Sequence, residues 1–140
     1  VTTRDRAKDM SADPGIEIRL AGFGQARTEK AFMPHAPVLA TGRAFENAGI
    51  SLNDVTAVKT HNPFAVNDIV FCRETGFDIT RMNNYGCSLI WGHPQGPTGL
   101  RAICELIEEL VIRGGGYGLF NGCAAGDSSV AAIIEVKDAA

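Results

Sequence analysis

The chain has 140 residues, 45% of them hydrophobic and 21% charged, and a formal net charge of −3 at pH 7. This size and composition predict one globular domain with a hydrophobic core, and the charge balance gives no basic surface of the kind that binds nucleic acid. No apolar stretch of the sequence approaches the roughly 20 residues that cross a bilayer, so we expect a cytoplasmic protein without a membrane partner.

The N-terminal third predicts a lead-in, a strand and a helix. Residues 1–15 are polar and are expected to be a poorly ordered lead-in or a linker remnant; because the chain does not begin with Met, we expect a fragment or a processed product. Ile16–Phe23 alternates apolar and polar residues, as strands do. After a loop over 25–37, apolar residues at helical spacing predict a helix over Val38–Ala48, ended by Gly49.

The middle of the chain predicts a strand over Val55–Thr60 and a helix from Pro63 to about Glu74, since proline is tolerated in the first helical turn. Residues 80–91 are expected to form a loop. A longer helix follows over Leu100–Arg113, with an apolar stripe on one side. The opposite side is expected to be a solvated acidic face made by Glu105, Glu108 and Glu109, with Arg101 and Glu105 as a pair at i, i+4.

The C-terminal segment predicts two further strands, Tyr117–Asn121 and Val130–Val136. Residues 122–129 between them are small and suit a tight turn near a ligand. The order of elements predicts an α/β domain over residues 16–140: a mixed sheet of about five strands with helices packed on it, parallel pairing early in the chain and a hairpin late.

The four cysteines form no Cys-x-x-Cys pair and only three histidines accompany them, so no zinc site is expected. Cys72 and Cys104 take apolar positions on predicted helices and are expected to be core residues. Cys87 flanks a histidine segment and is expected either to pack in the core or to line a pocket. His35 is expected to be a surface loop residue.

Three segments concentrate polar and reactive side chains at strand ends and turns: His61–Phe64, Gly92–Pro94 and Asn121–Gly126. In α/β sheets such positions converge on one crevice at the carboxyl ends of strands, which predicts a common site. The simpler alternatives stay open at this stage. Glycine and proline around His93 can merely punctuate a loop, and Cys123 can be a buried turn cysteine.

The same segments resemble the thiolases. The run Asn84–Gly99, with Gly-His-Pro-Gln-Gly-Pro-Thr-Gly at its end, is similar to the family's C-terminal histidine motif, and Tyr117–Cys123 resembles the strand and turn that carry its second cysteine. His61-Asn62-Pro63-Phe64-Ala65 stands where the family has Asn-Glu-Ala-Phe. The resemblance covers about residues 16–137 and implies a thiolase-like C-terminal domain. It implies thiolysis of a 3-oxoacyl-CoA or the reverse Claisen condensation, with CoA and acyl-CoA as substrates and no permanently bound cofactor.

The resemblance also implies roles for single residues. Cys123 would be the acid/base toward the substrate α-proton or the incoming CoA thiol, and His93 would donate a hydrogen bond to the thioester oxygen. His61 would hold the water that the family's asparagine holds, and main-chain N–H groups near Ala125 and Gly126 would form a second oxyanion hole. The remaining pocket residues are expected to be Asn62, Phe64, Cys87 and Gly92; no metal ligand is implied.

Two departures from the family pattern stand out. His61 and Asn62 resemble the His-Asp-x-Phe form found in sterol-carrier-type thiolases. After Cys123 the usual glycine-rich tract is replaced by Ala124–Ser129, whose Cβ atoms and acid would narrow the pocket or alter the loop.

The nucleophilic cysteine of a thiolase belongs to the preceding half of the enzyme, and no motif for that half occurs in this sequence. We therefore expect the isolated chain to be inactive, to need an N-terminal half on the same or a separate chain, and to form a homo-oligomer. Two alternatives remain: a thiolase-like lyase that cleaves a CoA-linked side chain by retro-aldol chemistry, and a non-catalytic subunit that binds acyl-CoA.

Overall fold

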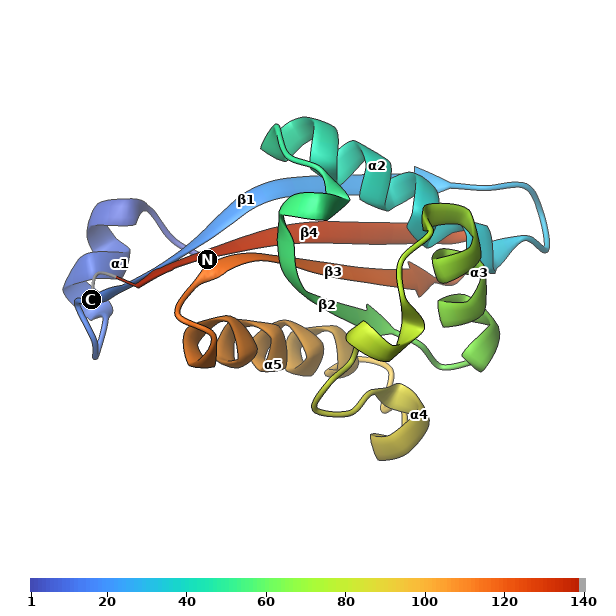
Figure 1. Ribbon diagram of the computed structural model, residues 1–140. Coiled ribbons are helices and arrows are strands. Elements are labelled where there is room, and N and C mark those ends of the chain that lie inside the picture. The colour runs from blue at the N-terminus through green and yellow to red at the C-terminus, as the bar shows by residue number, and fades with distance from the viewer. Residues whose placement is uncertain (139–140) are drawn as a thin grey trace.

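The computed structural model describes residues 1–138 and shows an α/β fold, a mixed sheet with helices on both faces (Figure 1). The predicted fold class is confirmed. The strands are β1 (Ile16–Arg27), β2 (Val55–His61), β3 (Gly116–Ala124) and β4 (Ser128–Asp138). The helices are α1 (Arg4–Met10), α2 (Ala36–Ala48), α3 (Ala65–Thr75), α4 (Ser88–Trp91) and α5 (Thr98–Ile112), with short 3-10 turns at Met33–His35, Leu52–Asp54 and Ile79–Arg81.

Within residues 1–138 the sheet has four strands, in the order β1-β4-β3-β2, rather than about five. Beside β2, where a fifth strand would lie, the chain makes one isolated parallel bridge between Val58 and Met82. The next residue, Asn83, has a positive φ of 56°, a conformation that strands do not use. Pairing therefore stops after a single bridge.

The strand pairing corrects one part of the topology prediction. β3 and β4 form the expected antiparallel hairpin, but the parallel pair joins β2 to β3, and the two earliest strands lie at opposite edges of the sheet. β1 instead pairs antiparallel with β4. The carboxyl ends of β2 and β3 consequently meet on the side of the sheet where α3 lies (Figure 1).

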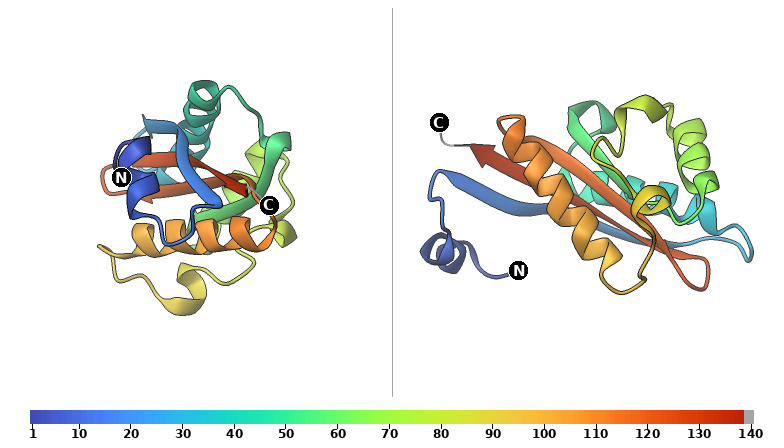
Figure 2. Two further views of the ribbon diagram at one scale, coloured as in Figure 1. Left: turned by 90° about the vertical axis from the view of Figure 1, so that its left-hand side faces the viewer. Right: turned by 90° about the horizontal axis from the view of Figure 1, so that it is seen from below.

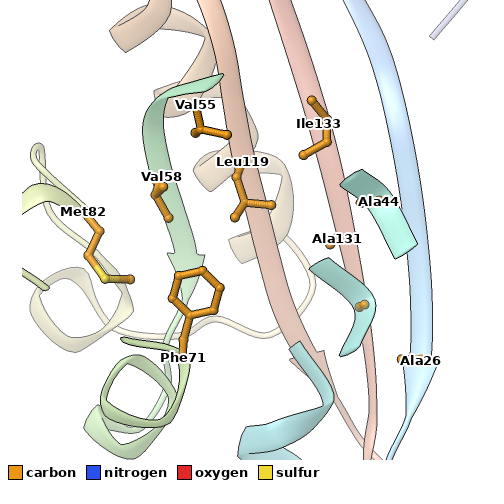
Figure 3. Packing of buried hydrophobic residues seen from close by; sticks show 10 residues of the cluster. Ala26, Ala44, Val55, Val58, Phe71, Met82, Leu119, Ala131 and Ile133 are labelled. Carbon is orange, nitrogen blue, oxygen red and sulfur yellow. The ribbon is translucent and has the colours of Figure 1, made fainter. Parts of the chain in front are cut away.

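Helix α2 covers one face of the sheet at close range (Figure 2). A Cβ atom built on Gly24 would lie 2.6 Å from the backbone nitrogen of Ala44 and closer still to the carbonyl oxygen of Ala40, so glycine is needed there. Gly22 and Gly24 therefore do not end the strand after Phe23, as the sequence suggested; they let β1 continue beneath α2 to Arg27. The core on this face includes Ala26, Ala40, Ala44, Val58, Phe71, Leu119 and Ile133 (Figure 3).

Helix α5 covers the opposite face with larger side chains (Figure 2). Leu106 and Leu110 are fully buried and form one cluster with Phe120 of β3 and Ile134 of β4. Gly118 lies directly beneath this contact: a Cβ atom there would come within 2.8 to 2.9 Å of both leucines. The predicted apolar stripe is thus the buried side of the helix.

Several local predictions differ from the structure. The lead-in contains helix α1, which is exposed and joined to β1 by an ion pair of 3.0 Å between Arg4 and Glu17. Residues 80–91 include the short helix α4. Helix α3 begins at Ala65, two residues after Pro63. The turn predicted over 122–129 is confined to 125–127, because Gly122, Cys123 and Ala124 continue β3 while Ser128 and Ser129 begin β4.

Candidate active site

His61 and Cys123 are brought together by the parallel pairing of β2 and β3. His61 is the last residue of β2 and pairs with Gly122, the residue before Cys123. The Nδ1 atom of His61 lies 3.2 Å from the carbonyl oxygen of Cys123, so we assign the proton of a neutral His61 ring to Nδ1. A Cβ atom on Gly122 would lie 2.8 Å from that of His61, so glycine permits this approach.

His93 reaches the same point from the segment between α4 and α5. Its Nδ1 lies 2.9 Å from the hydroxyl oxygen of Thr98, the first residue of α5. His61 Nε2 lies 3.1 Å and 3.3 Å from Nδ1 and Nε2 of His93, and the ring centroids are 4.3 Å apart. One arrangement of protons satisfies all three groups: Thr98 donates to Nδ1 of His93, and His93 Nε2–H donates to Nε2 of His61.

The electrostatics favour a neutral His61 ring. Partial burial lowers the pKa of His61, and the neighbouring His93 lowers it further, against a smaller opposing effect from the Cys123 carbonyl. With the proton of His61 on Nδ1, the Nε2–H of His93 is the donor at this contact. A placed N–H donor is what stabilises an oxygen on which negative charge develops.

Cys123 is buried and has a side-chain partner that the sequence analysis missed. The amide nitrogen Nδ2 of Asn67, on α3, donates to Sγ of Cys123 across 3.4 Å. Burial raises the pKa of Cys123, and the bond from Asn67 opposes this rise. No motif in the sequence marks Asn67, whose place beside Cys123 is shown by this contact and by its burial.

A network of buried polar side chains lies next to His61, around Asp68 of α3. Asp68 accepts hydrogen bonds from Thr60 Oγ1 at 2.6 Å and from the side chain of Asn62, and Asn83 bonds to Thr60 through both its side-chain ends. Asn62 Oδ1 accepts from the backbone N–H of Ser88 at 3.0 Å, at the start of α4. The network joins β2 and α3 to the segment that carries His93.

A second polar contact joins that segment to α5. Lys59 of β2 is 1% exposed; its Nζ donates to the Gly86 carbonyl and pairs with Glu105, both at 2.8 Å. Arg101 and Glu105 form the expected i, i+4 pair at 3.4 Å. The prediction of a solvated acidic face is wrong for Glu109, which is fully buried and accepts from Asn84 at 2.7 Å and from Arg113.

The turn after Cys123 is fixed to the loop that follows β1. Arg27 Nε donates to the carbonyl oxygen of Gly126 at 2.9 Å, and Asp127 Oδ1 accepts from the backbone N–H of Ala31 at 3.2 Å. Asp127 has a positive φ of 57°, which aspartate tolerates better than most residues. The backbone near Ala125 and Gly126 is exposed, as a donor site open to a ligand must be.

A cavity of about 220 Å³ opens beside Cys123 and His61. Its other lining residues are Gln95, Gly96, Gly99, Phe120, Gly122 and Val130. Four residues expected in the pocket lie elsewhere: Asn62 is fully buried in the polar network, Cys87 is buried, and Phe64 and Gly92 are exposed. His93 is not among the lining residues, but it contacts His61, which is.

The other cysteines and His35 differ partly from expectation. Cys104 is exposed rather than in the core, because α5 turns its neighbours Leu106 and Ala102 inward, and Cys72 is only half-buried beside Met82. His35 lies in a short 3-10 helix and lines a second cavity of about 410 Å³ with Arg27 and Phe32. Across residues 1–138, no group of three His, Cys, Asp or Glu side chains is placed to hold a metal ion, and no helix is long and apolar enough to cross a membrane.

Comparison with known proteins places this domain. Residues 16–136 match the family model described as thiolase, C-terminal domain. Curated relatives include the 3-ketoacyl-CoA thiolase of Pseudoalteromonas atlantica, 34% identical over 96% of this chain and 35% of its own length. Another is the acetyl-CoA acetyltransferase of Pseudomonas aeruginosa, 34% identical over 89% of this chain and 32% of its own length.

Solved structures agree with this match. The acetyl-CoA acetyltransferase of Bacillus anthracis superposes with a TM-score of 0.87 at 29% identity, over 96% of this chain and 34% of the other. Human mitochondrial 3-ketoacyl-CoA thiolase gives 0.86 at 31% identity, over 95% and 33%. The chain belongs to the thiolase family, as one of its C-terminal domains, and the resemblance drawn from three motifs is confirmed. It spans about a third of the length of the curated relatives it matches.

Proposed function

We propose that this chain is the C-terminal catalytic half of a thiolase-type acyltransferase, acting with an N-terminal half that supplies the nucleophilic cysteine. The observation that carries the proposal is the meeting of His61, His93 and Cys123, from three separate segments, at one edge of the sheet. The relatives' names, 3-ketoacyl-CoA thiolase and acetyl-CoA acetyltransferase, support CoA thioesters as its substrates. A cytoplasmic location and an oligomeric assembly are part of the same proposal.

In the synthetic direction, the Cys123 thiolate takes the α-proton of an acyl-CoA bound in the cavity. The electron pair of the broken C–H bond moves into the thioester, which becomes an enolate with its charge on oxygen. In thiolysis the same sulfur protonates the departing enolate and then accepts the proton of the incoming CoA thiol. Cys123 must therefore serve in both its thiol and its thiolate form.

The histidine pair stabilises the enolate oxygen in this proposal. The contact between His61 and His93 joins two ring nitrogens with little space between them. A thioester oxygen, or a water held by His61, replaces that contact and accepts the N–H of His93. The N–H groups at the turn after Cys123, near Ala125 and Gly126, supply a second donor site. The bond that Arg27 donates to Gly126 and the bond that Asp127 accepts from Ala31 hold this turn in place.

The test is a CoA-dependent cleavage assay with acetoacetyl-CoA. We expect no turnover from the chain alone and CoA-dependent release of acetyl-CoA once it is combined with an N-terminal thiolase half, on the same or a separate chain. Reconstituted enzyme that binds acetoacetyl-CoA but never cleaves it would contradict the proposal and favour a non-catalytic acyl-CoA-binding subunit.

A second candidate is a lyase that breaks a carbon–carbon bond of a CoA-linked side chain by a retro-aldol step. The feature that favours it is the turn over 125–127, where Asp127 stands in place of the glycine-rich tract and is bonded to the loop after β1. Free CoA is consumed in thiolysis and not by this lyase. Product formation that is independent of added CoA would therefore select the lyase.

A further inference from the structure

Asn67 occupies an unusual position beside Cys123. It lies in the first turn of α3, is 4% exposed, and directs Nδ2 at the sulfur across 3.4 Å. Its other polar atom, Oδ1, is buried and has no hydrogen-bond partner. A buried amide oxygen left unpaired costs about 1 to 3 kcal/mol, so a side chain that served only to fill this space would be better replaced by an apolar one.

The chemistry of an amide explains the position. An asparagine side chain has a two-donor end and an acceptor end of nearly equal size, and rotation about its last side-chain bond is soft and nearly two-fold. Nδ2 turned toward the sulfur complements a thiolate. Oδ1 turned toward the sulfur accepts the hydrogen of a thiol, and in that orientation the unpaired oxygen gains a partner.

We propose that Asn67 is a positioning residue for Cys123, whose amide turns over to donate to the thiolate and to accept from the thiol. The proposal deepens the acid/base role given to Cys123 above and rests on it. A group that must release and regain a proton in each cycle benefits from a neighbour that stabilises both of its states. Asn67 would do this without contributing a charge.

Other titratable groups approach Cys123 from several elements. His61 of β2 contacts its carbonyl oxygen rather than its sulfur, with His93 behind it, and the charge of Arg101 on α5 acts on His61. Asp68, the neighbour of Asn67 on α3, is engaged by Thr60 and Asn62. Within residues 1–138, Asn67 is thus the side chain that hydrogen-bonds to the sulfur. The opposing effects of burial and of Asn67 on the pKa of Cys123 agree with this geometry.

The first test titrates Cys123 in the 140-residue chain by the pH dependence of its alkylation with iodoacetamide, followed peptide by peptide in mass spectra. Removing the donor in Asn67→Leu should raise the midpoint of Cys123 by about one unit, since a hydrogen bond to a charged group is worth about that much. The near-isosteric Asn67→Asp places a carboxylate beside the thiolate and should raise it further. Asn53→Asp, an exposed change of the same chemistry, should leave it unchanged, and the exposed Cys104 serves as an internal reference.

A second measurement uses the unaltered chain, so it does not depend on how well the variants fold. The side-chain amide resonances of Asn67, followed by nuclear magnetic resonance, should shift with the same midpoint as Cys123. The proposal would be overturned if both variants kept the pH midpoint of Cys123 within about 0.2 units of the wild type. It would also be overturned if the Asn67 resonances did not shift when Cys123 ionises. Neither measurement involves turnover, so loss of the thiolase assignment and loss of the Asn67 role are separate outcomes.

Discussion

Helix α2 contacts β1 through glycine and alanine, whereas α5 contacts the opposite face of the sheet through leucines and a buried ion pair. Gly22 and Gly24 let the backbone of β1 touch that of α2, which sets the spacing of these elements by backbone sterics alone. Across the sheet, Lys59 and Glu109 hold the segment that carries His93 through charges and hydrogen bonds. The contact between β1 and α2 sets a close backbone spacing, and the contacts on the α5 face hold the segment that carries His93.

The largest loss of stability is expected from a substitution on the α5 face, at Lys59. Lys59→Met removes a fully buried ammonium, which leaves the Gly86 carbonyl without this donor and Glu105 with Arg101 as its remaining ion-pair partner. Since Glu105 is itself partly exposed, we expect a loss of about 3 kcal/mol in the free energy of unfolding, at the lower end for a broken buried pair. Urea denaturation measures it, with Lys30→Met on the surface as the control. A loss below about 1 kcal/mol would show that Lys59 does not support this face.

A smaller loss is expected on the α2 face. In Gly24→Ala the new Cβ atom collides with backbone atoms of α2, which cannot rotate away, so we expect about 2 kcal/mol of destabilisation from overpacking. The matched control is Gly42→Ala, on the open side of the same helix. There nothing lies within 4 Å of the new atom, and stability should rise by up to about 1 kcal/mol. Equal effects of the two substitutions in thermal unfolding would contradict the close contact.

The effect of pH on the free energy of unfolding should be smaller still, and it should depend on His61 and not on the contact between β1 and α2. His61 has a folded-state pKa below its ordinary value of 6.5, so the unfolded chain binds its proton more readily. The stability that the neutral ring contributes is present above pH 6.5 and is lost as the pH falls below that value toward the folded-state pKa. Unfolding curves at pH 7.5 and 5.5 should therefore differ less in His61→Phe than in the wild type. Gly24→Ala should keep the wild-type pH dependence.

The two faces also differ in how well the sequence predicts them. Alternation and helical spacing located β1, α2 and α5, because those patterns reflect a local choice of buried side. The sequence predicts Glu109 to be exposed, but it is buried with Asn84, which lies 25 residues earlier in the chain. A local sequence pattern cannot reveal such a distant partner. Likewise the sequence predicts that β1 ends at its glycines. Only the packing of α2 against them shows that they permit close contact and do not form a turn.

In the candidate site, too, residues in local motifs could be predicted from the sequence and long-range contacts could not. His61, His93 and Cys123 were recognisable because each stands in a motif at a strand end or turn. The contact of His61 with Cys123 follows from the parallel register of β2 and β3, and that of His93 from the segment between α4 and α5; the sequence specified neither. Asn67 lies outside the three motifs that contain His61, His93 and Cys123, and it is identified only by its distance from the sulfur and by its burial. Asn62 was grouped with the pocket because it adjoins His61, but its side chain points into the network with Asp68.

The most direct test is the rate of CoA-dependent cleavage of acetoacetyl-CoA by this domain joined to the proposed N-terminal half, measured for matched pairs of variants. Cys123→Ala is paired with Cys104→Ala, and His93→Ala with His35→Ala. The account predicts that the first member of each pair loses at least about 100-fold in kcat, as expected for a missing acid/base or oxyanion donor, and that the second keeps the wild-type rate. Wild-type rates in Cys123→Ala and His93→Ala would contradict it.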